Sequence, residues 1–186
     1  MAGDAELANV LKPIDVGPEM ANLARFHRDV SWIGTIVEGG MGPSTPKMWA
    51  RGIGQHQLIQ DGRWIVGTYE QDQFAPDGSF VLRWERHWVA GWDPVAGEYR
   101  ATLADNYGHA ELMRGYIAGD HLTFETLGDA RVRLRLVWDV TDPADMNWRN
   151  EMAAAGSPWS LIEEYQLTPI ALDQDELRTI TAEVIT

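Results

Sequence analysis

The chain has 186 residues, of which 45% are hydrophobic and 23% are charged, values typical of one globular domain. Its formal net charge of −13 repels phosphate backbones, so we expect no nucleic-acid partner. Cysteine is absent, which excludes disulfides, thiolate catalysis and cysteine-ligated zinc or iron–sulfur clusters.

Membrane and export signals are also missing from the sequence. No apolar run is long enough to span a bilayer, so we expect no membrane insertion. The opening residues, MAGDAELANVLKP, have neither a basic region nor a continuous apolar stretch, and so do not resemble a signal peptide. We therefore expect a cytoplasmic protein.

The first predicted element is a helix over residues 18–29. It begins with Gly-Pro and Glu19, which favour a helix N-terminus. The apolar residues that follow at helical spacing are Met20, Leu23, Ala24 and Phe26. We expect this apolar face to cover one end of the structure that follows.

Ten β-strands are predicted after the helix, separated by turn signals such as DG at 61–62, PDG at 76–78 and DPVAG at 93–97. The segments between these signals are rich in β-branched and aromatic residues, which is typical of an antiparallel meander. The predicted strands span residues 30–38, 48–59, 63–74, 80–92, 98–105, 110–117, 121–127, 130–140, 146–153 and 158–168.

The strand over 80–92 carries three of the nine tryptophans, at every fourth position. This spacing is compatible with a helix or a strand, but the segment lies between two turn signals inside the meander. We therefore expect a strand whose aromatic face points inward. The residues of that face are Phe80, Leu82, Trp84, Arg86, Trp88, Ala90 and Trp92. The inward face of the strand over 130–140 consists of Val132, Leu134, Leu136, Trp138 and Val140.

Five short motifs carry a resemblance to a known family: WIG at 32–34, DGRWIV at 61–66, GWDPVAGEYR at 91–100, DNYG at 105–108, and the late hairpin at 146–169. With these motifs the chain resembles the calycin β-barrels, which include lipocalins, fatty-acid-binding proteins and nitrobindin-like proteins. The resemblance implies an all-β fold, an antiparallel up-and-down barrel of about ten strands with a short N-terminal helix. The expected parts are an N-terminal extension at 1–17, the barrel with its leading helix at 18–169, and a C-terminal tail or extra strand at 170–186.

The chain departs from the nitrobindin group at the residues that bear on haem. That group opens with a Gly-x-Trp-x-Gly-x-Gly pattern, of which only Trp32 and Gly34 are present here. It also holds haem through a histidine late in the chain, whereas the last histidine here is His121. The five histidines form no His-x-His or His-Glu-x-x-His pattern. We therefore expect neither a haem nor another cofactor, and no metal site.

Arg86 is the first candidate site residue, because it lies between Trp84 and Trp88 on a predicted inward face. In a dry cavity it could bind a carboxylate, an enolate or another anionic oxygen. The alternative is a structural arginine that is paired with an internal carboxylate or stacked on tryptophan.

Three further residues are candidates for catalysis. Asp105 is either the partner of Arg86, a general base with a pKa raised by burial, or the cap of the turn at DNYG. His56 shares a face with Gly52 and Gly54, which leave space for a ligand, yet a lone histidine is more often a satisfied packing residue. Tyr69 could donate a hydrogen bond to a carbonyl oxygen.

The remaining candidates are expected to line the cavity and to contact the ligand. These ligand-binding residues are Trp84, Trp88, Trp138, Tyr99, Glu163 and Tyr165. Glu163 shares a face with Leu161, Tyr165 and Leu167. Alternation along the first strand predicts that Glu38 also points inward.

Three functions remain open from the sequence. The first is a carrier of a small, mostly apolar, oxygen-bearing organic molecule. The second, slightly favoured by the predicted polar cavity residues, is a cofactor-free cyclase, isomerase or dehydratase of natural-product metabolism acting on a polyketide-like or terpenoid-like compound. The third is an interaction protein whose barrel interior is packed and holds no cavity. The sequence is compatible with a homodimer and leaves the oligomeric state open.

Overall fold

A computed structural model describes residues 15–128 and 130–170 of the protein. Most of the predicted extension at 1–17 and nearly all of the predicted tail at 170–186 lie outside the described residues. The described elements are α2 (Pro18–Ala24), β1 (Val30–Ile36), β2 (Met48–Ile59), β3 (Trp64–Phe74), β4 (Phe80–Asp93), β5 (Glu98–Asp105), β6 (Ala110–Ala118), β7 (His121–Thr126), β8 (Val132–Asp139), β9 (Met146–Ala154) and β10 (Ser160–Pro169).

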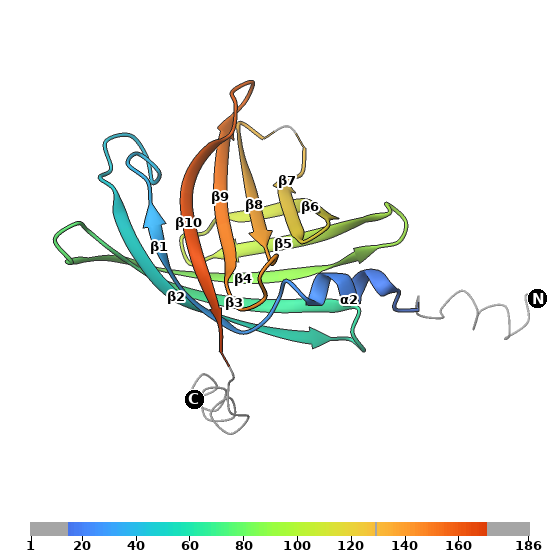
Figure 1. Ribbon diagram of the computed structural model, residues 1–186. Coiled ribbons are helices and arrows are strands. Elements are labelled where there is room, and N and C mark those ends of the chain that lie inside the picture. Colours follow the sequence, from blue (N-terminus) through green and yellow to red (C-terminus); the bar gives the residue numbers. More distant parts are fainter. Residues whose placement is uncertain (1–14, 129, 171–186) are drawn as a thin grey trace, which may run out of the picture.

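The strands form a closed antiparallel barrel in which each strand pairs with its neighbours in the chain (Figure 1). The first and last strands, β1 and β10, pair with each other from Val30↔Pro169 to Ile36↔Glu163 and so close the barrel. Every predicted strand is present, with ends that agree to within two residues. The all-β barrel with a short leading helix, as predicted from the sequence, is therefore confirmed.

Helix α2 is shorter than predicted, because the chain leaves the helical path after Ala24. The backbone N–H of Phe26 and of His27 donate to carbonyls only three residues back, which tightens the last turn. The His27 ring donates from Nδ1 to the Leu23 carbonyl and so satisfies one of the free carbonyls at the helix end. This turn directs both Phe26 and His27 into the end of the barrel, where they are buried.

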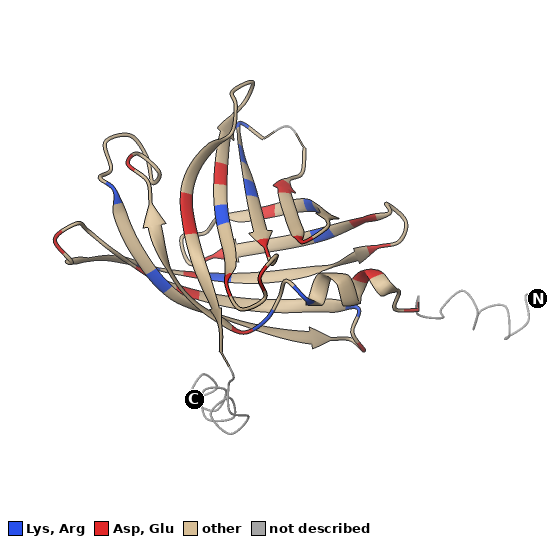
Figure 2. Cartoon of the chain, viewed as in Figure 1, with Lys and Arg blue, Asp and Glu red and all other residues tan. Residues whose placement is uncertain are grey.

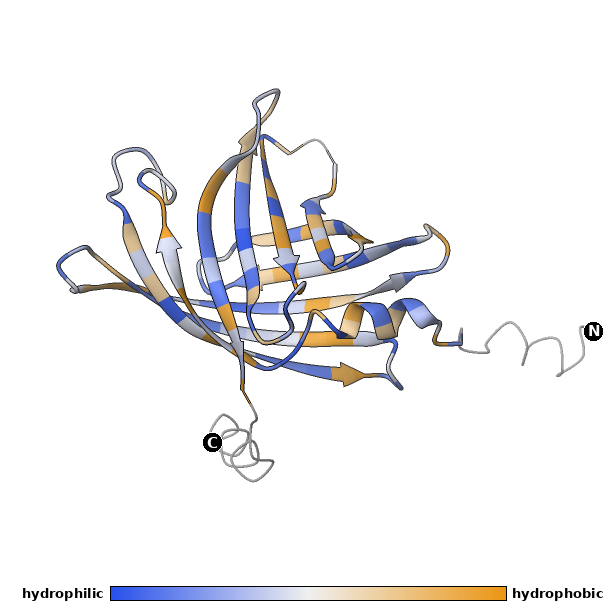
Figure 3. Cartoon of the chain, in the orientation of Figure 1, coloured by the Kyte–Doolittle hydropathy of each residue, from blue (hydrophilic) through white to orange (hydrophobic). Residues whose placement is uncertain are grey.

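Burial alternates along the strands. Hydrophilic and hydrophobic residues also form bands along them (Figure 3). On β4, Arg86, Trp88 and Ala90 are buried, while their immediate neighbours Glu85 and His87 are exposed. Alternation predicts the inward face correctly over most of this strand, because successive side chains of a strand point to opposite faces.

On the predicted inward faces of β4 and β8, two residues are exposed instead. Phe80 is 59% exposed because a β-bulge at the start of β4 pairs Phe74 with Phe80 but Gln73 with Leu82. The bulge interrupts the alternation of side chains between the two faces of the strand, so Phe80 does not share the inward face with the residues that follow Leu82. Val132 is 50% exposed because β8 begins there, at the edge of the barrel.

Glycines on β2 make room for aromatic rings of the barrel itself. A Cβ atom at Gly52 would collide with the Glu70 carbonyl oxygen and with the Trp32 ring, and one at Gly54 would press on the rings of Trp32 and Tyr69. The prediction that these glycines leave space for a ligand is therefore wrong, since internal side chains occupy that space.

Substitution Gly52→Ala is expected to lower the free energy of unfolding by about 1–3 kcal/mol, because backbone and ring must both move to admit the methyl group. Urea denaturation measures the change. The control is Gln57→Ala, an exposed residue of the same strand, which should change stability by less than about 0.5 kcal/mol. Equal effects of the two substitutions would contradict the close packing at Gly52.

Candidate functional site

Tryptophan rings fill much of the barrel interior. Trp138 and Trp148 are stacked with ring centroids 5.8 Å apart, and Trp32 meets Trp148 edge-on at 5.7 Å. Trp88 extends the cluster, with its ring centroid 5.9 Å from that of Trp138 and 5.0 Å from that of Phe124. Such contacts are typical of a well-packed aromatic core. Trp88 and Trp138, which were predicted to contact a ligand, are thus in contact mainly with other rings.

A small hollow remains beside this aromatic cluster, and we call it the Arg86 hollow. Its volume is about 20 Å³, enough for a single water molecule. The residues that line it are Trp32, Tyr69, Gln71, Trp84, Arg86, Trp148 and Glu163. The candidates Arg86, Tyr69, Trp84 and Glu163 come from three different strands, and the fold brings them to this one place.

Arg86 is buried with only 9% of its surface exposed. Its guanidinium carbon lies 4.9 Å from the centroid of the Trp84 ring, a distance typical of a cation–π contact. Among the residues that the structure describes, no carboxylate oxygen lies within 4.0 Å of it. The charge of this buried guanidinium is therefore only partly compensated.

Glu163 is the second charged residue of the hollow and is 3% exposed. Its carboxylate accepts hydrogen bonds from Asn150 Nδ2 and, at 2.5 Å, from the Tyr165 hydroxyl. Burial raises the pKa of Tyr165 well above its ordinary value, and the negative charge of Glu163 raises it further. Tyr165 therefore acts as a donor to Glu163.

A β-bulge at Ile162 decides which way Glu163 points. Leu161 pairs with Glu151, whereas Glu163 pairs with Asn150, so one residue of β10 is left over between them. Glu163 consequently faces inward with Tyr165 and Leu167, but Leu161 does not share their face as alternation predicted. Glu38, the other glutamate that was predicted to point inward, lies beyond the end of β1 and is exposed.

Several buried polar atoms of the barrel strands have no hydrogen-bond partner within the described residues. They are both amide atoms of Gln73, the Oδ1 atom of Asn150 and the indole nitrogen of Trp148. Gln71, in contrast, accepts a hydrogen bond of 3.1 Å from the Trp32 indole. Unpartnered buried polar groups are costly, and water or a ligand commonly satisfies them.

His56 lies behind Tyr69, in a second polar cluster where the chain crosses the barrel end. Its Nε2 atom accepts from the Tyr69 hydroxyl at 2.7 Å, and its Nδ1 atom donates to the Arg28 carbonyl at 2.8 Å. Burial lowers the pKa of His56 to about 4 and raises that of Tyr69. Both ring nitrogens are engaged, which favours the alternative of a satisfied packing histidine.

His27 belongs to the same cluster, and the sequence did not single it out. Its Nε2 atom accepts from the Trp88 indole at 3.2 Å, and the centroids of the His27 and His56 rings are 5.1 Å apart. Burial and, to a smaller extent, the neighbouring His56 lower the pKa of His27 to about 3. Its place inside the helix predicted over 18–29 gave no signal of this role, because only the observed path of residues 25–29 places it inside the barrel.

Asp105 caps the turn that follows β5. Its carboxylate accepts hydrogen bonds from the backbone N–H groups of Tyr107 and His109, from the His109 ring at 3.0 Å and from the Trp84 indole at 3.0 Å. Burial by itself raises the pKa of this carboxyl, but the hydrogen bonds outweigh burial and hold the pKa below its ordinary value. This geometry favours the turn-capping alternative over a general base or a partner of Arg86.

Tyr99 lies away from the hollow, at the helix end of the barrel, where its hydroxyl donates to the Glu19 carbonyl at 3.0 Å. It therefore tethers α2 to β5. Within the described residues, no group of three or more histidine, aspartate or glutamate side chains is arranged to hold a metal ion. Over the same residues, no helix is long and apolar enough to cross a membrane.

No protein-family model matches the chain, and a search of the curated proteins finds no match either. Among solved structures, the chain is similar to Rv2717c from M. tuberculosis, known from its crystal structure. The two agree with a TM-score of 0.56 and 15% sequence identity, over 84% of this chain and 100% of that one. At this identity the likeness shows a shared fold and carries no information on activity.

Proposed function

We propose that the protein binds a small, oxygen-bearing organic molecule at the Arg86 hollow. The observation that carries this proposal is a buried guanidinium that stacks on Trp84 but has no carboxylate within 4.0 Å among the described residues. A buried charge is costly unless it is paired, and a ligand carboxylate, enolate or carbonyl oxygen would pair it.

Glu163 supplies the second contact in this proposal. Its oxygens already accept from Asn150 and Tyr165, and each carboxylate oxygen can accept more than one hydrogen bond. A ligand with a hydroxyl or amino group beside its acidic or carbonyl oxygen would therefore bridge Arg86 and Glu163. The unpartnered indole nitrogen of Trp148, which also lines the hollow, favours a second acceptor atom on the ligand.

The size of the hollow limits how such a ligand binds. About 20 Å³ admits one water-sized group, so the body of the ligand must displace a side chain. Trp84 is the half-buried member of the lining, and its indole is held by one hydrogen bond to Asp105. We infer that Trp84 moves when the ligand binds, and that the apolar body of the ligand takes the place of its ring.

A binding or carrier function fits this geometry better than catalysis. The expectation of an enzyme depended on Arg86, Asp105, His56 and Tyr69 sharing one cavity. Of these four, only Arg86 and Tyr69 line the hollow, and the Tyr69 hydroxyl donates to His56. The cyclase, isomerase or dehydratase of natural-product metabolism is thus the second candidate, for which the Tyr69–His56 pair is the remaining acid–base group.

We also propose that the barrel belongs with the calycins, as the sequence motifs and the barrel of ten antiparallel strands suggest. The cytoplasmic location expected from the sequence stays a prediction, and the homodimer stays one option for the assembly. None of them affects the proposal for Arg86.

Substitution Arg86→Gln is expected to weaken ligand binding at least about tenfold, because a charge-assisted hydrogen bond in a buried site is lost. A lipophilic extract of the host is incubated with the purified protein, and mass spectrometry identifies the retained compound. The matched control is Arg83→Gln on the outer face of the same strand, where the side chain pairs with Asp72.

The recovered compound also separates the two candidate functions. A compound retained unchanged, and lost only in Arg86→Gln, supports a carrier. An isomer or a dehydrated product supports the enzyme. Retention that is equal in Arg86→Gln and Arg83→Gln, or no retention by the unaltered protein, would contradict the proposal.

A further inference from the structure

The barrel wall opens between β7 and β8 near their connecting loop. Backbone pairing of these strands ends at Glu125↔Arg135, whereas β8 continues to pair with β9 as far as Val132↔Ala154. At the next position, the Thr126 hydroxyl accepts from the Leu134 backbone N–H at 2.9 Å in place of a strand pair. Beyond it, Leu127 donates to the Leu112 carbonyl and so stays with β6. The two strands therefore diverge.

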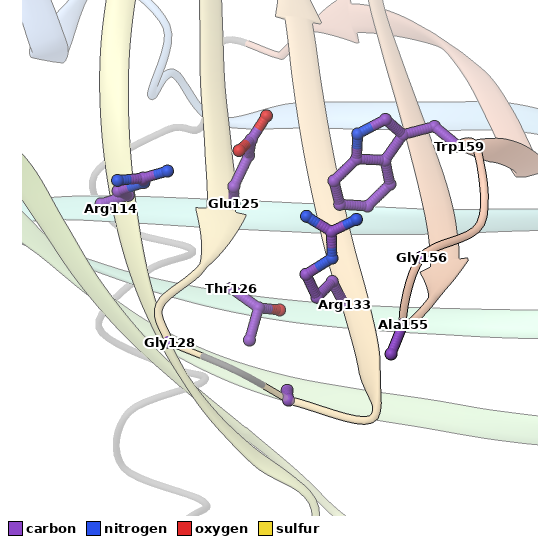
Figure 4. A pocket seen from close by; sticks show the side chains of 9 residues that line it. Arg114, Glu125, Thr126, Gly128, Arg133, Ala155, Gly156 and Trp159 are labelled. Carbon is purple, nitrogen blue, oxygen red and sulfur yellow. The ribbon is translucent and has the colours of Figure 1, made fainter.

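This divergence leaves a hollow of about 500 Å³ on the outer side of the barrel, which we call the β7–β8 wedge. Figure 4 shows Arg114 on one side of it and Arg133 on the other, below the Trp159 ring. Glu125 lies between them, and Thr126 and Gly128 lie at the loop end. The volume is within the range of small-molecule sites.

The arginines around the wedge differ in how their charge is balanced. Arg135 is paired with Glu125 at 2.8 Å and with Glu151 at 3.2 Å. Arg114 and Arg133 have no carboxylate oxygen within 4.0 Å among the described residues. Figure 2 shows the resulting band of basic and acidic positions across β6 to β10. In a chain with a net charge of −13, two uncompensated guanidinium groups at one hollow are unexpected.

Trp159 holds part of this arrangement in place. The guanidinium carbons of Arg133 and Arg135 lie 4.9 Å and 4.1 Å from the centroid of its ring. A guanidinium that is stacked on an indole loses little further freedom when it binds an anion. Both arginines are half-buried, because the Trp159 ring covers them.

We propose that the β7–β8 wedge binds a small molecule that carries a phosphate group, with Arg114 and Arg133 as its contacts. One bidentate guanidinium satisfies a carboxylate, whereas a phosphate monoester carries a charge of about −1.5 to −2 and can engage two. The carboxylate of Glu125 repels an anion less than a free carboxylate would, because Arg135 pairs with it at 2.8 Å. The site is separate from the Arg86 hollow, because Arg114 and Glu125 face outward and alternate with the buried Gly115 and Phe124.

Phenyl phosphate titrated into the full chain tests the proposal, with the indole N–H and arginine Nε–H signals followed by ¹⁵N NMR. We expect the Trp159 signal to shift, and Arg114→Gln and Arg133→Gln each to weaken binding at least about tenfold. The matched control is Arg51→Gln. Arg51 also lies on the outer face, 5.3 Å from the Phe74 ring centroid, but near Glu70 and Asp72.

Four outcomes would overturn the proposal. The first is an unshifted Trp159 signal, and the second is an equal loss of binding in Arg51→Gln, which would indicate non-specific attraction. The third is equally strong binding of benzoate at the same ionic strength, which would assign the site to carboxylates. Arg86→Gln should leave phosphate binding unchanged, and loss of binding in that variant would place the anion in the interior instead. Failure here leaves the proposal for Arg86 untouched.

Discussion

Replacing Trp88 by alanine is expected to lower the free energy of unfolding by about 3–5 kcal/mol. The side chain is only 1% exposed, packs edge-on against Phe124 and contacts Trp138. Its indole also donates to His27 Nε2, so the substitution leaves a buried ring nitrogen without its donor. Urea denaturation followed by circular dichroism measures the change.

Two further variants separate packing from hydrogen bonding at this position. Trp88→Phe keeps much of the ring volume but removes the N–H donor. We therefore expect its free energy of unfolding to lie between that of the unaltered protein and that of Trp88→Ala. Trp64→Ala is the control, because Trp64 is half-buried on the outer face of β3. This substitution should lower the free energy of unfolding distinctly less than Trp88→Ala does. Equal losses for Trp64→Ala and Trp88→Ala would contradict a core organised around Trp88.

Stability should fall steeply between about pH 6.5 and pH 4.5, by up to about 1.4 kcal/mol per pH unit for each of His27 and His56. Burial holds the native pKa of these rings at about 3 and about 4, against an ordinary value of 6.5. As the pH falls below 6.5, the unfolded chain binds protons that the native rings do not accept. The stabilisation is therefore complete above pH 6.5 and is lost as the pH falls.

Titratable groups around the histidines do not obscure this window. Tyr69 faces His56, and its pKa is raised by burial, so it stays neutral throughout. Carboxyls whose native pKa is lowered, such as Asp105 and Asp139, contribute only below about pH 4, where they would protonate in the unfolded chain. The slope above that pH thus reports on the histidines.

Denaturation of His27→Gln and His56→Gln across this pH range provides the test. Each variant should be less stable at pH 7 but should show a shallower dependence on pH. His87→Gln, an exposed histidine on the outer face of β4, should keep the original slope. The explanation fails if the slope is the same in all three variants.

The positions of the strands could be predicted because their signals are local. Gly62, Gly78, Gly97 and Gly108 all lie in predicted turn signals, and all four have a positive φ angle. Glycine adopts that conformation without a steric penalty, so a glycine that follows Asp, Asn or Pro within a few residues indicates a turn. Between these turns, alternation over several residues identifies the buried face of each strand.

The site could be predicted only in part. Alternation placed Arg86, Tyr69 and Trp84 inside the barrel, and all three line the hollow. It could not tell that the Asp105 carboxylate is engaged by its own turn, because that depends on the exact backbone of residues 105–109. Nor could it find His27, whose burial depends on how the chain crosses the barrel end.

The sequence by itself determined the order of the elements and which face of each strand is apolar, since both follow from backbone geometry and from neighbours a few residues away. The tertiary structure alone decided how full the interior is. Trp32 from β1 fills the space beside Gly52 of β2, and Trp148 from β9 stacks on Trp138 of β8. Packing of this kind depends on side chains from strands far apart in the chain, and alternation does not encode their sizes, rotamers or bulge-shifted registers.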